Sequence, residues 1–304
     1  MPFYTDSLAL PDSAFVLMRN LIHEHTGLFY ENGKNELLAD KLSPLVIDRG
    51  FSSFLDYYYL LKYDPQAGDE WKRVADALSV PETYFWREID QVRALVDVLA
   101  PQYFSGFRAR PLRIWSAACA TGEEPLTIAM ALNEAGWFNR APSEIFASDA
   151  SARAIETARR GFYRERSFRS LSPDLREKYF TKENGSWRAI PELLARISWS
   201  VANLTNDAEI APLATAPVIF CRNVFIYFSQ DSIRKTVKAF SRWMPCPGHL
   251  FVGASESLLR ITSDFDFQEI RGAFAYVKLP VESAGGAIGI ESSQRLSGVG
   301  ANSK

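Results

Sequence analysis

Cysteine and histidine are scarce in this chain of 304 residues. The three cysteines are odd in number and show no CxxC spacing, and the three histidines are scattered along the sequence. This composition argues against a disulfide framework and against a zinc site. We therefore expect a protein of the reducing cytoplasm that uses no metal ion.

Long apolar runs and an excess of charge of one sign are also missing. No stretch approaches the roughly 20 apolar residues of a membrane-spanning helix, and the N-terminal residues do not resemble a secretory signal peptide. The 34 basic and 36 acidic residues leave a formal net charge of −2, so no global field draws the chain to nucleic acid or to a membrane. We expect a monomer that neither binds nucleic acid nor inserts into a membrane.

Apolar residues at helical spacing fill the first third of the chain. They predict an all-helical N-terminal domain with a connecting helix, residues 1–105. Asp12 or Ser13 is expected to cap the first helix, which ends at Gly27. The last helix of this region is expected from Thr83 to Ala100.

Proline and serine mark two further boundaries in this region. Pro44 lies inside the helical pattern Asn35 to Asp48 and is expected to kink that helix or to restart it. Ser52 or Ser53 is expected to cap the aromatic helix that follows.

The pattern changes after residue 106 to alternating strand and helix, which predicts a doubly wound α/β sheet. The run Leu112–Ala118 is typical of a buried strand. A second strand, Ile145–Ser148, delivers Asp149 at its carboxyl end. An acidic residue there can accept both hydroxyls of a ribose, although it can also simply cap the following helix.

The turn after the first strand, Cys119–Pro125, suggests the kind of ligand. Its single glycine, Gly122, falls short of the full dinucleotide fingerprint. Glu123 and Glu124 would repel a pyrophosphate, so a cationic or zwitterionic ligand suits the turn better. S-adenosylmethionine, with its sulfonium and amino groups, is such a ligand, while an ordinary strand–helix joint is the alternative.

The second half of the chain carries the rest of the sheet and one insertion. Residues 162–198 break the strand–helix rhythm, and Asn184-Gly185 is a good hairpin signal, so we expect an inserted antiparallel β-subdomain. The main domain is expected to end near residue 280, followed by a flexible Gly/Ser-rich tail, 281–304. Further strands of the main sheet are expected at Ile197–Val201, Val218–Phe220, His249–Gly253 and Phe274–Leu279.

Five sequence blocks recur in the order and spacing of a known family. The blocks are WSAACATGEEP, ASDAS, ARRGFYRE, VIFCRNVFIYF and GHLFVGASESL. In these blocks the chain resembles the chemotaxis receptor methyltransferases, the CheR family, and the resemblance runs from about residue 11 to residue 280, more loosely in the helical part.

The resemblance implies both a fold and an activity. The fold is an all-helical domain followed by a Rossmann-like class I methyltransferase sheet with an inserted small antiparallel β-subdomain. The activity is transfer of a methyl group from S-adenosylmethionine to glutamate side chains in the cytoplasmic helical domain of a methyl-accepting chemoreceptor. The products would be glutamate methyl esters and S-adenosylhomocysteine.

Individual roles follow from the same resemblance. Arg222 and Tyr227 are implied to face the substrate, with Arg87 as a third catalytic candidate. Each of these positions also has a purely structural alternative, such as a surface charge for Arg87 or a core aromatic for Tyr227. The residues implied to bind the cofactor are Thr83, Arg87, Gly122, Glu123, Asp149, Asn203, Leu204, Cys221 and Arg222.

The chain departs from the family pattern at several positions. Pro81 stands where the family has asparagine, and Ala254 stands where it has histidine, which leaves open a cofactor-binding regulatory module without catalysis. The early helices carry few basic residues for docking, and the candidates are Lys34, Lys41 and Arg49. The hairpin around residues 182–186 is short. We therefore expect an enzyme that is not tethered through a receptor's C-terminal pentapeptide, and a different acceptor remains the second alternative.

Glutamate methylation agrees with the small number of candidate bases. A glutamate carboxyl titrates near pH 4.3, so it is already ionised at neutral pH and needs no general base. Arg222 would orient the carboxylate without holding it so tightly that the ground state is favoured.

Overall fold

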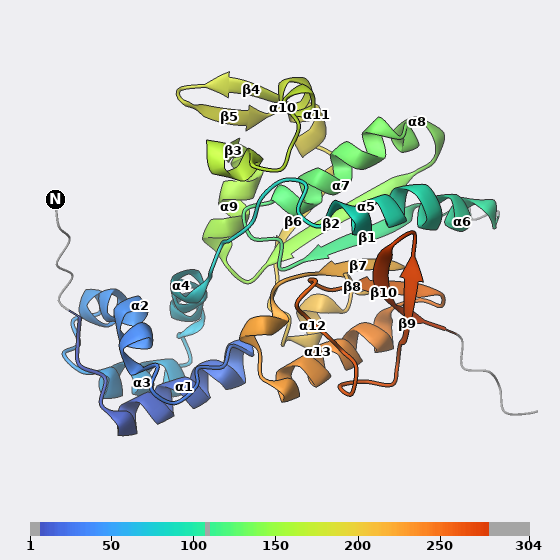
Figure 1. Cartoon of the computed structure of the whole chain (residues 1–304). Helices are drawn as coiled ribbons and strands as arrows, with labels where there is room; N and C mark the ends of the chain where they lie inside the picture. The colour runs from blue at the N-terminus through green and yellow to red at the C-terminus, as the bar shows by residue number, and fades with distance from the viewer. Residues whose placement is uncertain (1–6, 107–109, 280–304) are drawn as a thin grey trace, which may run out of the picture.

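The structure is a computed structural model that describes residues 7–106 and 110–279. It consists of a helical N-terminal lobe, a large α/β domain and a small separate sheet (Figure 1). Within the described ranges, no helix combines the length and apolarity needed to cross a membrane. The tail expected at residues 281–304 lies outside the described residues.

Four helices pack around one core in the N-terminal lobe. Ser53 caps α3 by accepting a hydrogen bond from the Asp56 backbone, as predicted. The expected cap of α1 by Asp12 or Ser13 is wrong, because the helix begins at Asp12 and Pro11 occupies the cap position without a side-chain acceptor. The helices are α1 (Asp12–Thr26), α2 (Asn35–Asp48), α3 (Phe54–Tyr63) and α4 (Gly68–Leu78).

Pro44 does not restart α2, contrary to one of the two expectations. The helix runs without interruption from Asn35 to Asp48. Its buried residues Leu38, Leu42 and Val46 lie on both sides of the proline. Core packing therefore holds both halves in one helix, and the proline ring lies on the exposed face.

A buried carboxylate ties three of these helices together. Glu70 on α4 is 1% exposed and accepts a hydrogen bond from the Tyr57 hydroxyl at 2.7 Å. Its other oxygen accepts hydrogen bonds from Arg49 Nε at 2.7 Å and from Arg73 Nη1 at 3.2 Å. Burial acts to raise the pKa of Glu70, but the hydrogen bonds from Arg49 and Tyr57 outweigh it and lower that pKa below its ordinary value.

Replacing Glu70 by glutamine is expected to destabilise the lobe by about 3 kcal/mol at pH 7. Breaking a buried ion pair typically costs about 3–5 kcal/mol, and we take the low end because Arg49 and Arg73 keep contact with water. Since the folded pKa is depressed, this stabilisation is present above the unfolded pKa of about 4.3 and is lost as the pH falls through the folded value.

Urea unfolding of wild type and Glu70→Gln between pH 7 and pH 3 measures this difference. The exposed Glu36→Gln on α2 serves as the matched control. A Glu70→Gln protein as stable as wild type at pH 7, or a gap that widens toward acid, contradicts the prediction.

The main sheet has seven strands in the order β6-β2-β1-β7-β8-β10-β9. All neighbouring pairs are parallel except those that β10 makes with β8 and β9. This order confirms the predicted doubly wound, Rossmann-like sheet. The strands are β1 (Leu112–Ala117), β2 (Ser143–Asp149), β6 (Ile197–Val201), β7 (Val218–Cys221), β8 (Gly248–Phe251), β9 (Asp266–Ile270) and β10 (Ala273–Lys278).

Edge strand β9 was missed from sequence. It has no fully buried residue, because only one neighbour covers it, so the apolar alternation that marks a half-buried strand is weak. The strand order changes direction at β1, which has β2 on one side and β7 on the other. Ligands of such sheets bind at the carboxyl ends of the strands next to this point.

Helices cover both faces of the sheet, and each face has its own core. On one face lie α5 (Ile89–Ala94), the π-helical segment η1 (Leu95–Leu99), α6 (Ala100–Ser105), α7 (Glu123–Glu134), α8 (Trp137–Arg140) and α9 (Ala152–Arg160). On the other face lie α12 (Asp207–Ile210) and α13 (Gln230–Trp243).

The helix expected from Thr83 to Ala100 begins six residues late, at Ile89, and the helical segments continue to Ser105. Residues 83–88 form a loop because Phe85 is drawn into an aromatic cluster under the inserted sheet, where its backbone N–H donates to the Ser167 carbonyl at 2.9 Å. Trp86 and Glu88 adopt positive φ angles of 66° and 48°. This non-helical loop brings Thr83 and Arg87 close to the carboxyl ends of the central strands.

The inserted β-subdomain is present as predicted. Asn184 and Gly185 form the hairpin turn with φ angles of 48° and 77°, and the small antiparallel sheet has the order β3-β5-β4. Its elements are β3 (Phe162–Tyr163), the 3₁₀ turn η2 (Glu165–Phe168), α10 (Pro173–Tyr179), β4 (Phe180–Glu183), β5 (Ser186–Ala189) and α11 (Pro191–Leu194).

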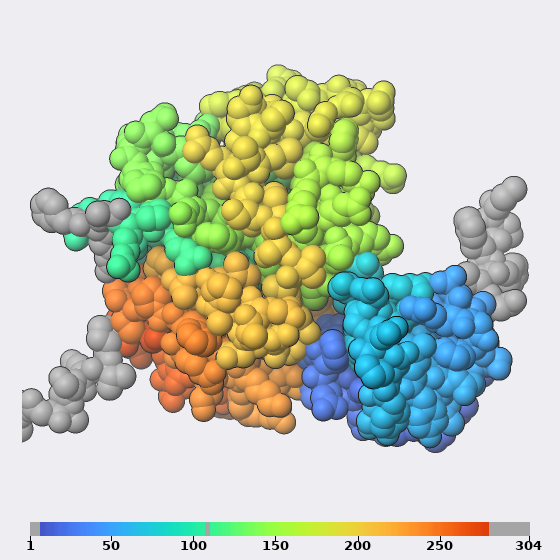
Figure 2. Space-filling view, turned by 180° about the vertical axis from the view of Figure 1, so that it is seen from behind, coloured from blue at the N-terminus to red at the C-terminus, as the bar shows by residue number. Residues whose placement is uncertain are grey.

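The helical lobe lies against the α/β domain, and the space-filling view shows an indentation between the lobe and the inserted subdomain (Figure 2). The core of the lobe ends at Leu78, and the core of the sheet begins at Phe85. The domain boundary near residue 105 stays a prediction.

Candidate active site

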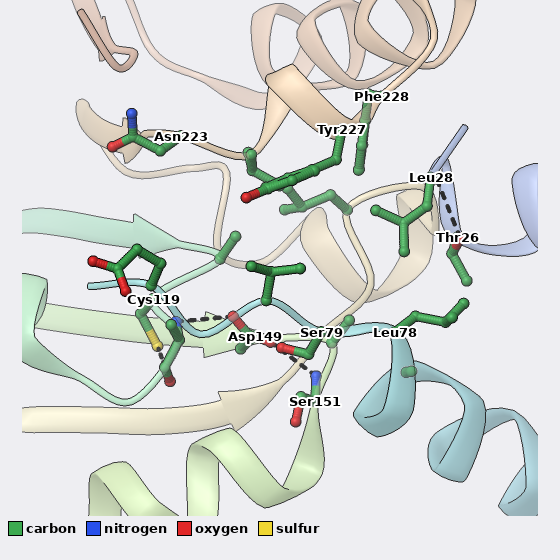
Figure 3. A pocket seen from close by; sticks show the side chains of 18 of the residues that line it. Thr26, Leu28, Leu78, Ser79, Cys119, Asp149, Ser151, Asn223, Tyr227 and Phe228 are labelled. Atoms are coloured by element: carbon green, nitrogen blue, oxygen red, sulfur yellow. Dashed lines mark hydrogen bonds between the residues drawn. The ribbon is translucent and has the colours of Figure 1, made fainter. Parts of the chain in front are cut away.

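A cavity of about 250 Å³ lies where the lobe meets the carboxyl ends of the central strands. Seven of the sequence-predicted site residues line it: Thr83, Arg87, Asp149, Asn203, Leu204, Arg222 and Tyr227. Gly122, Glu123 and Cys221 are not among the described residues of its wall. Figure 3 shows Asp149 and Ser151 on one side of this cavity and Tyr227 on the other.

Gly122 shapes the turn after β1. Its φ is 96°, and a Cβ added there would lie 2.9 Å from both the Ala158 side chain and the Trp199 ring. The glycine therefore permits close packing of the turn against α9 and β6. Helix α7 begins directly after it, at Glu123, so the predicted turn through Pro125 is three residues too long. Proline is tolerated there because the first helical turn has no intrahelical partner for its N–H.

Asp149 ends β2 with both carboxylate oxygens anchored. One accepts a hydrogen bond from the Ala120 backbone N–H and the other from the Ser151 backbone N–H, each at 2.9 Å. Burial nevertheless raises the pKa of Asp149 above its ordinary value. The residue lines the cavity, where its remaining lone pairs are suited to two hydroxyl donors.

The two adjacent acids of the turn point to different places. Glu123 is 3% exposed and accepts hydrogen bonds from Thr121 Oγ1 at 2.7 Å and Ser167 Oγ at 3.0 Å. Burial raises the pKa of Glu123. Glu124 instead lines the cavity and accepts a hydrogen bond from Ser116 Oγ at 2.6 Å. Sequence reasoning assigned the cofactor to Glu123 and missed Glu124.

Arg222 is a buried cation in the wall of the cavity. It is 7% exposed, and its Nε donates to Glu124 Oε2 at 2.5 Å. Its Nη1 donates to the Arg87 carbonyl at 3.0 Å and to Gln91 Oε1 at 3.2 Å. Among the described residues no partner binds Nη2. Glu88 Oε2, a buried oxygen with no hydrogen-bond partner in this part of the chain, lies 3.8 Å from Nη1.

Tyr227 belongs to a short 3₁₀ turn, η3 (Phe225–Tyr227), and its ring lies across the cavity (Figure 3). Glu256 shapes this loop by accepting hydrogen bonds from the backbone N–H groups of Asn223 at 2.8 Å and Ile226 at 3.2 Å. The block GHLFVGASESL, which contains Glu256, therefore supports the loop that carries Arg222 and Tyr227. Its role as a support was not predicted.

The remaining predicted residues are already engaged. Asn203 lines the cavity, but its side-chain amide donates to the His25 carbonyl at 2.7 Å. Arg87 donates to the Glu82 carbonyl at 3.0 Å. Cys221 is fully buried behind the cavity, where burial raises the pKa of its thiol.

The N-terminal lobe supplies a wall of the cavity that sequence reasoning missed. Leu28, Tyr30, Lys41 and Leu78 line it from that side. Burial raises the pKa of Tyr30 to about 12 and lowers the pKa of Lys41. The blocks of the resemblance lie in the α/β domain, so they gave no signal for these residues.

The donor set fits S-adenosylmethionine. Asp149 suits a ribose, Glu124 suits an ammonium group, and apolar Leu204 and Leu78 are available beside a base. Pro81 and Ala254, the two departures from the family pattern, lie outside the described cavity wall.

Comparison with known proteins agrees with this architecture. Residues 13–79 match the family model "CheR methyltransferase, all-alpha domain", and residues 81–274 match "CheR methyltransferase, SAM binding domain". Chemotaxis protein methyltransferase 2 of Vibrio cholerae is 33% identical over 276 residues, which are 90% of this chain and 95% of that protein. Chemotaxis protein methyltransferase of Escherichia coli is 32% identical over 281 residues, with 90% and 93% covered. The chain therefore belongs to the CheR family and is an S-adenosylmethionine-dependent methyltransferase of the chemotaxis type.

Proposed function

We propose that the acceptors are glutamate side chains in the cytoplasmic helical domain of a methyl-accepting chemoreceptor. The reaction forms an ester bond between a glutamate oxygen and the methyl carbon, breaks the methyl–sulfur bond, and leaves S-adenosylhomocysteine. The observation that carries the proposal is Arg222, a buried guanidinium in the cavity wall whose Nη2 has no partner among the described residues. A carboxylate is the acceptor that such a group recognises best.

S-adenosylmethionine supplies, when bound, a methyl group activated by its sulfonium. Asp149 would hold the ribose hydroxyls, because its oxygens line the cavity at the end of β2. Glu124 would hold the amino group of the methionine end. Thr83, Arg87, Asn203 and Leu204 would complete the wall around the rest of the molecule.

The described residues supply positioning and charge. The acceptor carboxylate is ionised at neutral pH, since glutamate titrates at about pH 4.3. Glu124 already neutralises much of the Arg222 charge through Nε. The guanidinium is therefore left with Nη2 to orient an acceptor carboxylate. This agrees with the need for an orienting contact that does not stabilise the ground state excessively. Tyr227 is exposed enough, at 37%, to contact an entering peptide.

The inserted hairpin is short, which favours an enzyme that does not bind a receptor's C-terminal tail. Strands β4 and β5 have four residues each and are joined by the two-residue turn Asn184-Gly185. We propose on this basis that the enzyme methylates receptors without a C-terminal pentapeptide tether.

Labelled S-adenosylmethionine and receptor cytoplasmic fragments test both parts. We expect methyl label that is released as methanol by base, and we expect its loss when the acceptor glutamates are changed to glutamine. Fragments with and without a C-terminal pentapeptide should be methylated at the same rate.

Other results have definite meanings. Base-stable label identifies a different kind of acceptor. Cofactor binding without transfer to any fragment supports the regulatory module. Tight binding of the isolated pentapeptide overturns the untethered model.

A further inference from the structure

The C-terminal end of α1 contacts two separate loops that border the cavity. The first is the loop after β6. The His25 carbonyl accepts hydrogen bonds from Asn203 Nδ2 at 2.7 Å and from Thr205 Oγ1 at 3.0 Å. Asn203 Oδ1 in turn accepts from the Thr205 backbone at 3.0 Å. The conformation of this loop therefore depends on a carbonyl of the N-terminal lobe.

The second contact is with the loop that carries Tyr227. The Phe29 backbone N–H donates to the Tyr227 carbonyl at 2.9 Å, and Leu28 forms an isolated antiparallel bridge with Phe228. His23 Nε2 lies 2.7 Å from Ser229 Oγ. Figure 3 shows Leu28 facing Phe228 across this junction.

Gly27 lies between the two loops and allows both contacts. It follows α1 with a φ of 79°. A Cβ added at this position would lie 2.9 Å from the Phe228 ring and 2.9 Å from the Thr205 methyl group. The backbone of the lobe thus packs directly on both loops, with no room for a side chain.

We propose that this junction, residues 23–29, positions the two loops for the reaction. It holds Asn203 and its neighbours for the cofactor and Tyr227 for the acceptor. His23 and Gly27 are positioning residues that act through those loops. The assignment for Tyr227 rests on the proposed acceptor, and the assignment for Asn203 rests on its proposed place beside the cofactor.

Two features make the junction a constraint on the side chains of both loops. The Asn203 side chain makes its hydrogen bonds with His25 and Thr205. The Tyr227 hydroxyl has no hydrogen-bond partner among the described residues, so its ring is placed by the backbone of its loop. Displacing the lobe by a few tenths of an ångström at Gly27 would therefore move both groups.

Gly27→Ala tests the junction, with Gly50→Ala as the matched control. Gly50 also follows a helix and has a φ of 78°. A Cβ added at this position would have no other atom within 4 Å. Both variants share the backbone strain of a non-glycine residue at positive φ. Only Gly27→Ala adds a steric overlap with Phe228 and Thr205. The dissociation constant of S-adenosylhomocysteine is measured by calorimetry, and kcat with labelled S-adenosylmethionine and a receptor fragment.

We expect Gly27→Ala to raise the dissociation constant and to lower kcat, each by about tenfold, equivalent to about 1.4 kcal/mol. Gly50→Ala should leave both unchanged. Equal values for the two variants overturn the proposal. The binding measurement needs no acceptor, so it decides the cofactor part even if the receptor fragment is not methylated.

His23 separates the two loops, since its Nε2 contacts Ser229 and Ser232 next to the Tyr227 loop, its ring packs edge-on against Phe29, and no described residue of the loop after β6 touches it. His23→Leu should lower kcat about tenfold and leave the dissociation constant of S-adenosylhomocysteine unchanged. His23→Gln, which can replace the Nε2 contact, should restore most of kcat. A loss shared by both variants, or a weaker cofactor affinity in His23→Leu, contradicts this arm and indicates a merely structural role.

Discussion

Replacing Arg222 with alanine is expected to lower kcat by about a thousandfold while S-adenosylhomocysteine still binds. Removal of one preorganised donor from an active site typically costs about 10²–10³ in kcat. Here the substitution also leaves Glu124 without its 2.5 Å partner, next to an incoming carboxylate. The added repulsion between two anions takes the effect to the upper end of that range. Cofactor binding is kept because Asp149 and Glu124 remain in the wall.

The measurement is kcat with a methyl-accepting receptor fragment, together with calorimetry of S-adenosylhomocysteine. Arg222→Lys is the informative companion, because a lysine keeps the charge but cannot donate to Glu124, to the Arg87 carbonyl and to an acceptor from one planar group. We expect the kcat of Arg222→Lys to exceed that of Arg222→Ala by less than about tenfold. Near-normal turnover in Arg222→Ala would remove the proposed role.

Changing Glu124 to glutamine is expected to weaken S-adenosylmethionine binding by about a hundredfold. A charge-assisted hydrogen bond to an ammonium group is worth about 1.5–3 kcal/mol, and the variant also leaves Arg222 without its closest counter-charge. The same change at Glu123 should alter binding by less than about threefold. Glu123 is buried and faces Thr121 and Ser167. A glutamine can accept from one of these hydroxyls through its oxygen and donate to the other through its amide nitrogen.

The pair Glu124→Gln and Glu123→Gln is its own control, because the two residues are adjacent and the substitution is identical. Calorimetry with S-adenosylhomocysteine gives both dissociation constants, and thermal unfolding shows whether either variant has lost its fold. If Glu123→Gln weakens binding more than Glu124→Gln, the cavity acid suggested by the sequence is right and the one indicated by the structure is wrong.

Local signals in the sequence were reliable where local geometry decides the outcome. The Asn184-Gly185 hairpin follows from residues that tolerate positive φ, and the Ser53 cap from a side chain that reaches its own helix. The strand ending in Asp149 follows from a short apolar run. These features depend on neighbours within a few positions, which is the range over which backbone preference and periodicity act.

Long-range contacts overruled the sequence pattern elsewhere. The segment Thr83–Glu88 has helical periodicity, yet it forms a loop because Phe85 packs under the inserted sheet. Pro44 does not restart its helix because the core holds both flanking turns. Strand β9 was missed because its position at the edge leaves it without a buried face.

By itself, the sequence determined the fold class, six of the seven strands of the main sheet, the family and seven residues of the cavity wall. Only the tertiary structure decided which of two adjacent acids enters the cavity, that Asn203 is held by the N-terminal lobe, and that this lobe forms a wall of the site. The physical reason is one of range. Periodicity and turn chemistry fix elements from within, whereas the direction of a side chain and its partners depend on packing between segments that can lie more than a hundred residues apart.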